Sequence, residues 1–221
     1  EAKNVDPYKE DFTSEFYAAL GYLASIDLLK IKGNESHLLT PKLLLRYSPG
    51  SMRKETEGFR LNPISAFNIN RLENKNNFET GLSGTIGFDY NVSSDFQEFD
   101  FSVAQVINEE ANSKKSDISS LNEKLSDFVG SASMKFNENF KLNYDFAIDQ
   151  NYQDLNYGEL GANVNFGPLK FDLNYLQEKK HIGDQDYLTT KIDYNNRKGL
   201  VSFEAKRNLI TNSAEFYNLS Y

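Results

Sequence analysis

The two histidines, His37 and His181, are the residues with the widest chemical range in this sequence. A histidine acts as a general base or a metal ligand only when an orienting partner or further ligands lie nearby. The 221-residue chain contains no cysteine, which excludes thiolate zinc sites, disulfides and cysteine nucleophiles. Because the two histidines are far apart and no ligand spacing surrounds them, we expect both to be solvated side chains.

The serines and glycines form no recognised catalytic motif. Ser102, Ser126 and Ser131 stand outside any G-x-S-x-G context, the signature of a hydrolase nucleophile. The sequence also lacks the phosphate-cradling patterns G-x-x-x-x-G-K-[ST] and G-x-G-x-x-G. Three glycines between Gly81 and Gly87 fall inside a strand pattern, where bulges or close strand approach explain them best. We therefore predict no catalytic, cofactor-binding or metal-binding residues and no cofactor.

Acidic residues outnumber basic ones by 32 to 24, which gives a formal net charge of -8 at pH 7. A protein that binds duplex nucleic acid usually carries an excess of basic residues, which this chain lacks. Two acidic pairs, Asp184 with Asp186 and Glu109 with Glu110, carry the oxygen ligands that calcium prefers. Neither pair has the ligand number or glycine spacing of a calcium loop, so we interpret both as solvated surface.

Apolar residues recur with period two along much of the chain. In Phe140–Asp149 five apolar residues alternate with five others, which predicts a strand with one apolar and one polar side. The preceding segment, Ser131–Phe136, and the polar turn at Asn137–Asn139 complete a hairpin. Further strands of this kind are predicted near residues 18–31, 37–48, 80–91, 97–107, 160–166, 169–175, 188–194, 201–205 and 217–221.

About ten or eleven strands and no helix are expected, so we predict an all-β, antiparallel up-and-down meander. Its connections alternate in length, with short turns inside hairpins and two long polar segments at about 49–79 and 108–126. Segments of that length are uncommon without a function or packing of their own. Outer-membrane barrels show the same alternation of tight turns and long loops.

Two interpretations of the alternation remain open: a soluble antiparallel sheet with one wet face, and a membrane β-barrel. No run of about 18 apolar residues is present, which excludes a transmembrane helix but not barrel strands. The barrel is favoured because the polar rows carry Asn, Asp, Lys and Gly, as a water-filled lumen requires. Aromatic residues at the ends of apolar rows would form interfacial girdles: Phe140, Phe166, Tyr175, Tyr194 and Tyr221.

Several runs, in a consistent order, resemble the barrel of the LptD family of lipopolysaccharide (LPS) assembly proteins, also called organic-solvent-tolerance proteins, in an alphaproteobacterial style. The similarity covers nearly the whole chain and is specific only as a combination. The runs are HLLTPKLLLRYSPG from His37, LNPISAFNINRL from Leu61, ETGLSGTIGFDY from Glu79, SSLNEKLSDFVGSASMKFNENFKLNYDFAIDQN from Ser119, LNYGELGANVNF from Leu155, IGDQDYL from Ile182 and RNLITNSAEFYNLSY from Arg207.

The resemblance implies a very large outer-membrane barrel preceded by a periplasmic jelly-roll domain. Members of this family hold a lipoprotein plug, LptE, in the lumen and receive LPS from a periplasmic bridge of Lpt proteins. They insert it into the outer leaflet through a lateral opening and perform no covalent chemistry. The resemblance therefore implies localisation in the outer membrane, with LPS, an LptE-like lipoprotein and the Lpt bridge as partners.

Residues 1–221 are expected to form one partial barrel domain, with the signal peptide, the jelly roll and the final strands outside it. The lateral gate would then lie outside the chain, so no transport residue can be assigned by resemblance. The basic pairs Arg53–Lys54 and Lys114–Lys115 fall in the two long segments. They would meet the anionic sugars of LPS if those segments face outward, but ordinary loop solubility is the favoured explanation.

The barrel interpretation predicts which side of each strand meets lipid. The predicted lipid-facing residues are Leu142, Tyr144, Phe146 and Leu173, and the predicted lumen-facing residues are Asn143, Asp145 and Asn174. Two alternatives remain: a self-contained small barrel, porin-like or adhesin-like, which the aromatic row Tyr217–Tyr221 would suit, and a soluble β-sandwich that binds carbohydrate.

Overall fold

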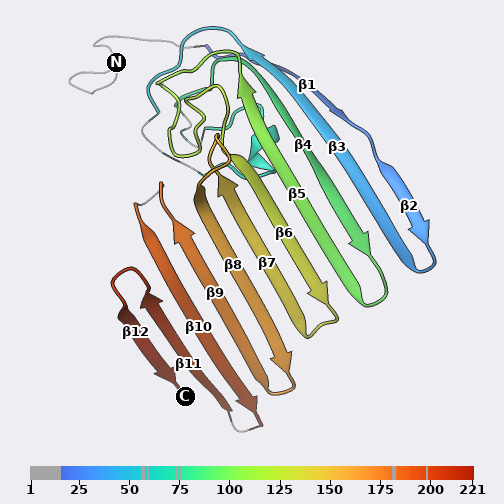
Figure 1. Cartoon of the computed structure of the whole chain (residues 1–221), viewed down its shortest axis with the longest axis vertical. Coiled ribbons are helices and arrows are strands. Elements are labelled where there is room, and N and C mark those ends of the chain that lie inside the picture. Colours follow the sequence, from blue (N-terminus) through green and yellow to red (C-terminus); the bar gives the residue numbers. More distant parts are fainter. Residues whose placement is uncertain are drawn as a thin grey trace.

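The computed structural model describes residues 16–55, 58, 60–72, 74, 76–180, 183–197 and 199–221. They form one twelve-stranded antiparallel sheet in which neighbours follow chain order, except that β2 pairs with β3 beside β1 (Figure 1). The predicted all-β meander is thereby confirmed. The strands are β1 (Leu20–Ser25), β2 (Leu28–Lys32), β3 (Glu35–Ser48), β4 (Gly81–Ser93), β5 (Gln97–Asn108), β6 (Phe128–Phe136), β7 (Phe140–Ile148), β8 (Leu155–Phe166), β9 (Leu169–Glu178), β10 (Gln185–Asn196), β11 (Gly199–Asn208) and β12 (Ser213–Ser220).

The sheet has one strand more than expected because the predicted strand at 18–31 is broken in two. β1 ends opposite Lys42 and β2 begins opposite Leu39, which leaves Ile26 and Asp27 unpaired between them. The residue that faces Ile26 is Pro41, whose carbonyl accepts the Ile26 N–H at 3.3 Å but whose nitrogen carries no hydrogen. The missing donor interrupts the ladder at this point.

Short and long connections lie at opposite ends of the sheet (Figure 1). The tight turns share one end, and three of them contain a residue with positive φ: Gly33 (60°), Asn137 (54°) and Gly167 (56°). The other end carries the two long connections, 49–80 and 109–127, and we call their described residues the cap. The cap includes the one short 3₁₀ turn of the described residues, η1 (Ser65–Phe67).

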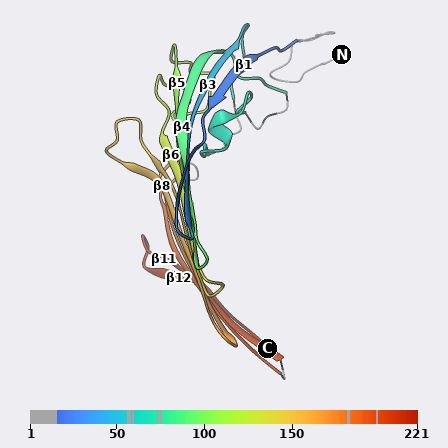
Figure 2. The same ribbon diagram turned by 90° about the vertical axis from the view of Figure 1, so that its right-hand side faces the viewer.

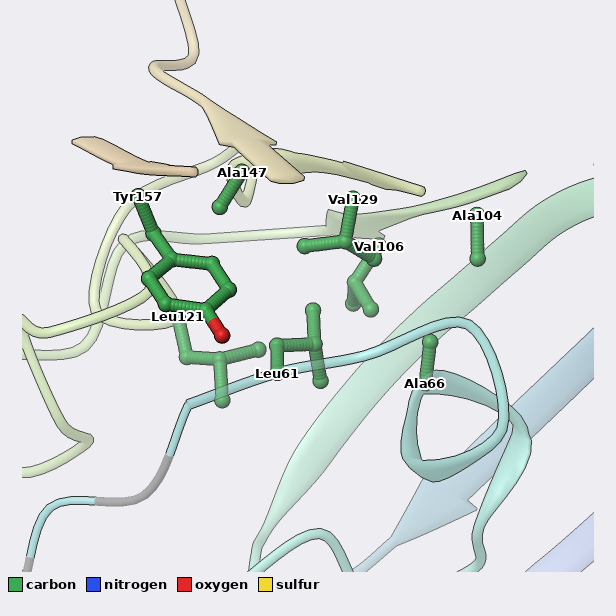
Figure 3. Packing of buried hydrophobic residues seen from close by; sticks show 8 residues of the cluster. All are labelled: Leu61, Ala66, Ala104, Val106, Leu121, Val129, Ala147 and Tyr157. Atoms are coloured by element: carbon green, nitrogen blue, oxygen red, sulfur yellow. The ribbon is translucent and has the colours of Figure 1, made fainter. Parts of the chain in front are cut away.

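The sheet is curved, and the η1 segment of the cap lies on its concave side (Figure 2). A small core joins the cap to that side: Leu61, Ala66 and Leu121 of the cap pack against residues of β5 to β8 (Figure 3). Side chains alternate along a strand, so these contacts fix which residues of each strand face the cap. The strand residues of this core are Ala104, Val106, Val129, Ala147 and Tyr157.

The described residues form a single sheet, and no second sheet covers either face. The β-sandwich alternative is therefore wrong, because a sandwich needs two sheets packed face to face. β1 and β12 do not pair with each other among the described strands, so the sheet is open.

Candidate functional site

The convex face of the sheet carries the apolar rows predicted from the sequence. Ala147 of β7 faces the cap, so Asn143 and Asp145, which share its parity, are concave, and Tyr144 and Phe146 are convex. Many large apolar side chains of this face are exposed to solvent, which marks a contiguous surface rather than scattered residues. They include Leu43, Leu45, Tyr47, Leu82, Ile86, Ile107, Phe136, Phe166, Phe171, Leu173, Tyr194, Phe203, Tyr217 and Leu219.

The apolar band slopes across the ladder. Its midpoint lies at Leu43 on β3, in the row of Gln105, and at Phe203 on β11, in the row of Gln97. The band therefore moves eight residues over eight strand-to-strand steps, or one residue per strand. With about 3.3 Å per residue and about 4.8 Å between strands, this displacement corresponds to strands tilted by about 35° from the band normal. Barrel strands in the outer membrane are tilted by a similar angle.

Gln105 is a buried polar residue of the convex face, and its polar atoms are satisfied. Gln105 is 6% exposed; its side-chain amide donates to the carbonyl oxygen of Ser126 at 3.0 Å, and its amide oxygen accepts from the Tyr152 hydroxyl at 2.6 Å. Tyr152 belongs to the connection between β7 and β8 and also packs against Phe128 of the convex face. This loop thus covers a buried amide that would be costly to leave unpaired in an apolar surface.

The concave face is polar, and its side chains bond across the strands. Asn163 donates to Asp172 at 2.6 Å, and Asn174 donates to Glu159 at 2.8 Å. The face has acids and bases as well as amides, with Lys191 and Asp193 3.0 Å apart. The sheet therefore separates an apolar side from a polar side, as the alternation predicts.

A buried ion cluster anchors the cap to the concave face. Arg71 donates to both carboxylate oxygens of Glu79, at 2.7 and 2.5 Å, and Lys115 reaches the same carboxylate at 2.9 Å. Arg46, on β3, donates to the backbone carbonyls of Ile69 and Glu79. All four charged residues are buried, with exposed fractions of 6% or less.

Glu79 is ionised within this cluster. Burial opposes its ionisation, but the charges of Arg71, Lys115 and Arg46, together with the hydrogen bonds from Arg71, outweigh burial and lower its pKa to about 2. Lys115 has the opposite balance, because burial lowers the pKa of its ammonium more than Glu79 raises it. The surroundings thus stabilise the charged form of Glu79, whereas they destabilise the charged form of Lys115.

A second polar group joins the cap to β8. Asp127 accepts from the Ser120 hydroxyl at 2.7 Å and from the Asn156 amide at 3.0 Å, and Lys180 lies 3.7 Å away. Burial raises the pKa of Asp127, and the hydrogen bonds from Ser120 and Asn156 partly offset this effect. These bonds fix the end of the cap where it enters β6.

A cavity of about 360 Å³ opens on the concave face beside the cap. Arg60 lies over the Tyr157 ring, 3.4 Å from its centroid, and forms an ion pair with Glu178. Ser102, Ser131 and Asp145 line the opposite wall. The arrangement offers a polar, partly aromatic surface with no nucleophile and base in contact.

The candidate chemical residues of the sequence are dispersed in the structure. His37 bonds to the Tyr90 hydroxyl at 2.8 Å and lies 3.7 Å from Glu35, whereas His181 lies outside the described residues. No group of three or more His, Cys, Asp or Glu side chains that could hold a metal occurs in the described part of the chain.

One charged pair differs from the sequence interpretation. Lys114 is exposed, but Lys115 turns inward to Glu79 and is only 6% exposed, so it is neither a solvated loop residue nor part of an outward basic surface. The buried Arg46, Arg71 and Glu79 were not predicted at all, because they come from segments 8 to 69 residues apart from one another and from Lys115. No local spacing marks such a cluster.

The described residues contain no helix that is long and apolar enough to cross a membrane. No curated protein matches the chain. A family model, LptD, described as LPS transport system D, matches residues 22–216, which covers all strands from the middle of β1 to the middle of β12. The chain therefore belongs to the LptD family and is an outer-membrane protein of LPS transport.

Proposed function

We propose that this chain is part of the barrel wall of the outer-membrane translocon that inserts LPS into the outer leaflet. The convex face meets lipid and the concave face lines the lumen. The observation that carries the proposal is the apolar band, which runs across ten neighbouring strands and slopes by one residue per strand. A soluble protein would bury such a band, whereas a tilted membrane strand presents it to the bilayer.

Residues 1–221 act, in this proposal, as a partial barrel domain, with an LptE-like lipoprotein in the lumen and the periplasmic Lpt bridge as further partners. The polar concave face supports a water-filled lumen, and the tight turns at one end suit the periplasmic side. The cap then lies at the outer end of the lumen. The protein performs transport without covalent chemistry.

A self-contained small barrel is the alternative, and the intact mass of the native protein in its outer-membrane fraction separates the two. A part of a larger translocon has a mass several-fold above the 25.2 kDa of this chain. A mass near 25.2 kDa would favour the small barrel instead. The open sheet supports the first outcome, since β1 and β12 lie at opposite edges among the described strands (Figure 1).

Two neighbouring residues of β7 test the orientation. Tyr144→Arg places a charge on the convex face, where a charge at the bilayer midplane costs about 2–4 kcal/mol. Asn143→Arg places the same charge on the concave face, where water is present. We expect Tyr144→Arg to reduce the amount of assembled, heat-modifiable protein in the outer membrane and Asn143→Arg to leave it near the wild-type level. Equal assembly of both variants would contradict the orientation.

A further inference from the structure

The cap is attached to the sheet by a small apolar core, by neutral hydrogen bonds to β5 and by a buried ion cluster. The apolar core includes Leu61, Ala66 and Leu121 of the cap (Figure 3). Beside this small core lies the ion cluster, in which Arg71 and Glu79 belong to the first long connection and Lys115 to the second. Arg46 belongs to β3 and supplies the strand side of the attachment.

Glu79 is the residue that Arg71, Lys115 and Arg46 all contact. Of the described carboxylates, it alone pairs with Arg71 and Lys115, and its backbone carbonyl accepts from Arg46. Three cations therefore surround one carboxylate in a buried site. The Nη1 atom of Arg46 is buried without a hydrogen-bond partner among the described residues, so positive charge is in excess there. Removing the carboxylate would leave three uncompensated cations close together, a costly arrangement in a site shielded from water.

The two connections are also hydrogen-bonded to each other. The Glu55 amide donates to the Lys114 carbonyl at 2.7 Å, and the Leu61 amide donates to the Ser119 hydroxyl at 2.8 Å. The Lys115 ammonium adds further contacts, to Glu79 and to Asn108 at the end of β5, but the bonds from Glu55 and Leu61 join the two connections without it. A change at Glu79 is thereby transmitted to both halves of the cap.

We propose that the cap is a latched lid over the concave face, that Glu79 is its latch, and that breaking the ion pairs of Glu79 with Arg71 and Lys115 releases both connections together while the sheet stays intact. Because cations are in excess, loss of Glu79 should affect the cluster more than loss of Lys115. The inference rests on the proposed function only if the space under the cap is taken to be the barrel lumen. The release of the cap depends on the fold alone.

Hydrogen–deuterium exchange of the full-length native protein in detergent or lipid discs measures the release. In Glu79→Gln we expect exchange to increase at least tenfold in peptides from 60–72 and 110–126. Peptides from β9 to β11 should be unchanged. Lys115→Met removes a charge of the opposite sign and should change cap exchange by less than threefold. Glu98→Gln, at an exposed ion pair with Lys135 far from the cap, is the matched surface control.

Wild-type exchange in the cap of Glu79→Gln would overturn the proposal, as would an equal increase in Lys115→Met. If Glu79→Gln does not assemble, Glu79→Asp decides, since it keeps the charge but withdraws the carboxylate from its partners. Faster exchange confined to the cap supports the latch, and unchanged exchange refutes it. None of these results depends on which face meets lipid, so a failure of the latch and a failure of the barrel-wall proposal are distinguishable.

Discussion

Gly87 lies where β4, β5 and the cap come closest together. A Cβ atom at this position would collide with the backbone carbonyl of Val103 and would lie 3.2 Å from the ring of Phe67 in η1. The Val103 carbonyl cannot relieve this clash by a rotamer change, because it belongs to the backbone. The absence of a side chain at Gly87 therefore sets both the strand spacing and the depth to which the cap packs.

We predict that Gly87→Ala destabilises the folded barrel by about 1–3 kcal/mol, the usual cost of overpacking. The measurement is the temperature at which the heat-modifiable band of the full-length protein is lost. Gly84→Ala is the matched control on the same strand, because the nearest atom to its added methyl group is a Leu45 carbon at 3.7 Å, an ordinary contact. The same loss of stability in both variants would show that strand flexibility, rather than close approach, is what these glycines supply.

Residue-scale chemistry was the least predictable part of the molecule. The sequence attributes the glycines at 81, 84 and 87 to bulges or close strand approach. Only Gly87 shows close approach; Gly84 has ordinary contacts, and Gly81 has a positive φ of 102° in open space. The sequence places Lys115 on a solvated loop, since a lysine in a polar segment is nearly always exposed. Its partner Glu79 is 36 residues away along the chain. Only the folded sheet brings the two segments to the same place.

At the scale of the strands, the alternation predicted from β7 onward is confirmed, and the deviation near the N-terminal edge has a single cause. Pro41 turns its nitrogen toward Ile26, so β3 cannot donate a hydrogen bond where β1 would continue into β2. The sequence predicts both the strand that contains this proline and the strand beside it, but not the register that places Pro41 opposite Ile26. A broken edge strand could not be predicted until the pairing was known.

We predict that Pro41→Val joins β1 and β2 into one strand. The new N–H supplies a ladder hydrogen bond worth about 0.5–1.5 kcal/mol, and valine suits a paired strand better than proline. Hydrogen exchange in peptides from 20–32 of the full-length protein should slow by about 2- to 10-fold.

Thr40→Val is the comparison for this change. It removes the hydroxyl that donates to Asp27 at 2.8 Å and adds no backbone donor, so exchange in the same peptides should become faster. If Pro41→Val leaves exchange at the wild-type rate, the interruption has another origin, such as a preference of Ile26 and Asp27 for the bulged conformation.

For the whole molecule, the sequence predicts one sheet with an apolar and a polar side, but not how its long segments are used. The two polar segments are predicted to be too long to be structureless, and the structure shows why: described residues of both contribute side chains to the core on the concave face. Their apolar contributions, such as Leu61, Ala66 and Leu121, are isolated in sequence and show no period. Periodicity reveals elements that repeat, whereas a cap is held by contacts that occur once.

The slope of the apolar band leads to a prediction about the placement of the whole molecule in the membrane. Leu39 and Leu188 lie in the same ladder row, seven strand-to-strand steps apart. If strands ran along the bilayer normal, the two residues would lie at the same depth. With a tilt of about 35° and strands about 4.8 Å apart, we expect their depths to differ by about 20 Å. Leu43 and Phe203, at the midpoints of the band, should instead lie at equal depth.

Spin labels attached at these four positions of the full-length protein in lipid bilayers measure the depths through their relative accessibility to oxygen and to a water-soluble relaxant. Labels at 43 and 203 should both be most accessible to oxygen, and labels at 39 and 188 should report opposite interfaces. Equal depth for Leu39 and Leu188 would contradict the tilt and, with it, the assignment of the convex band to lipid. The labels at 43 and 203 are the control for perturbation by the label itself. Two labels on distant strands would report equal depth by accident only if both shifted their strands by the same amount.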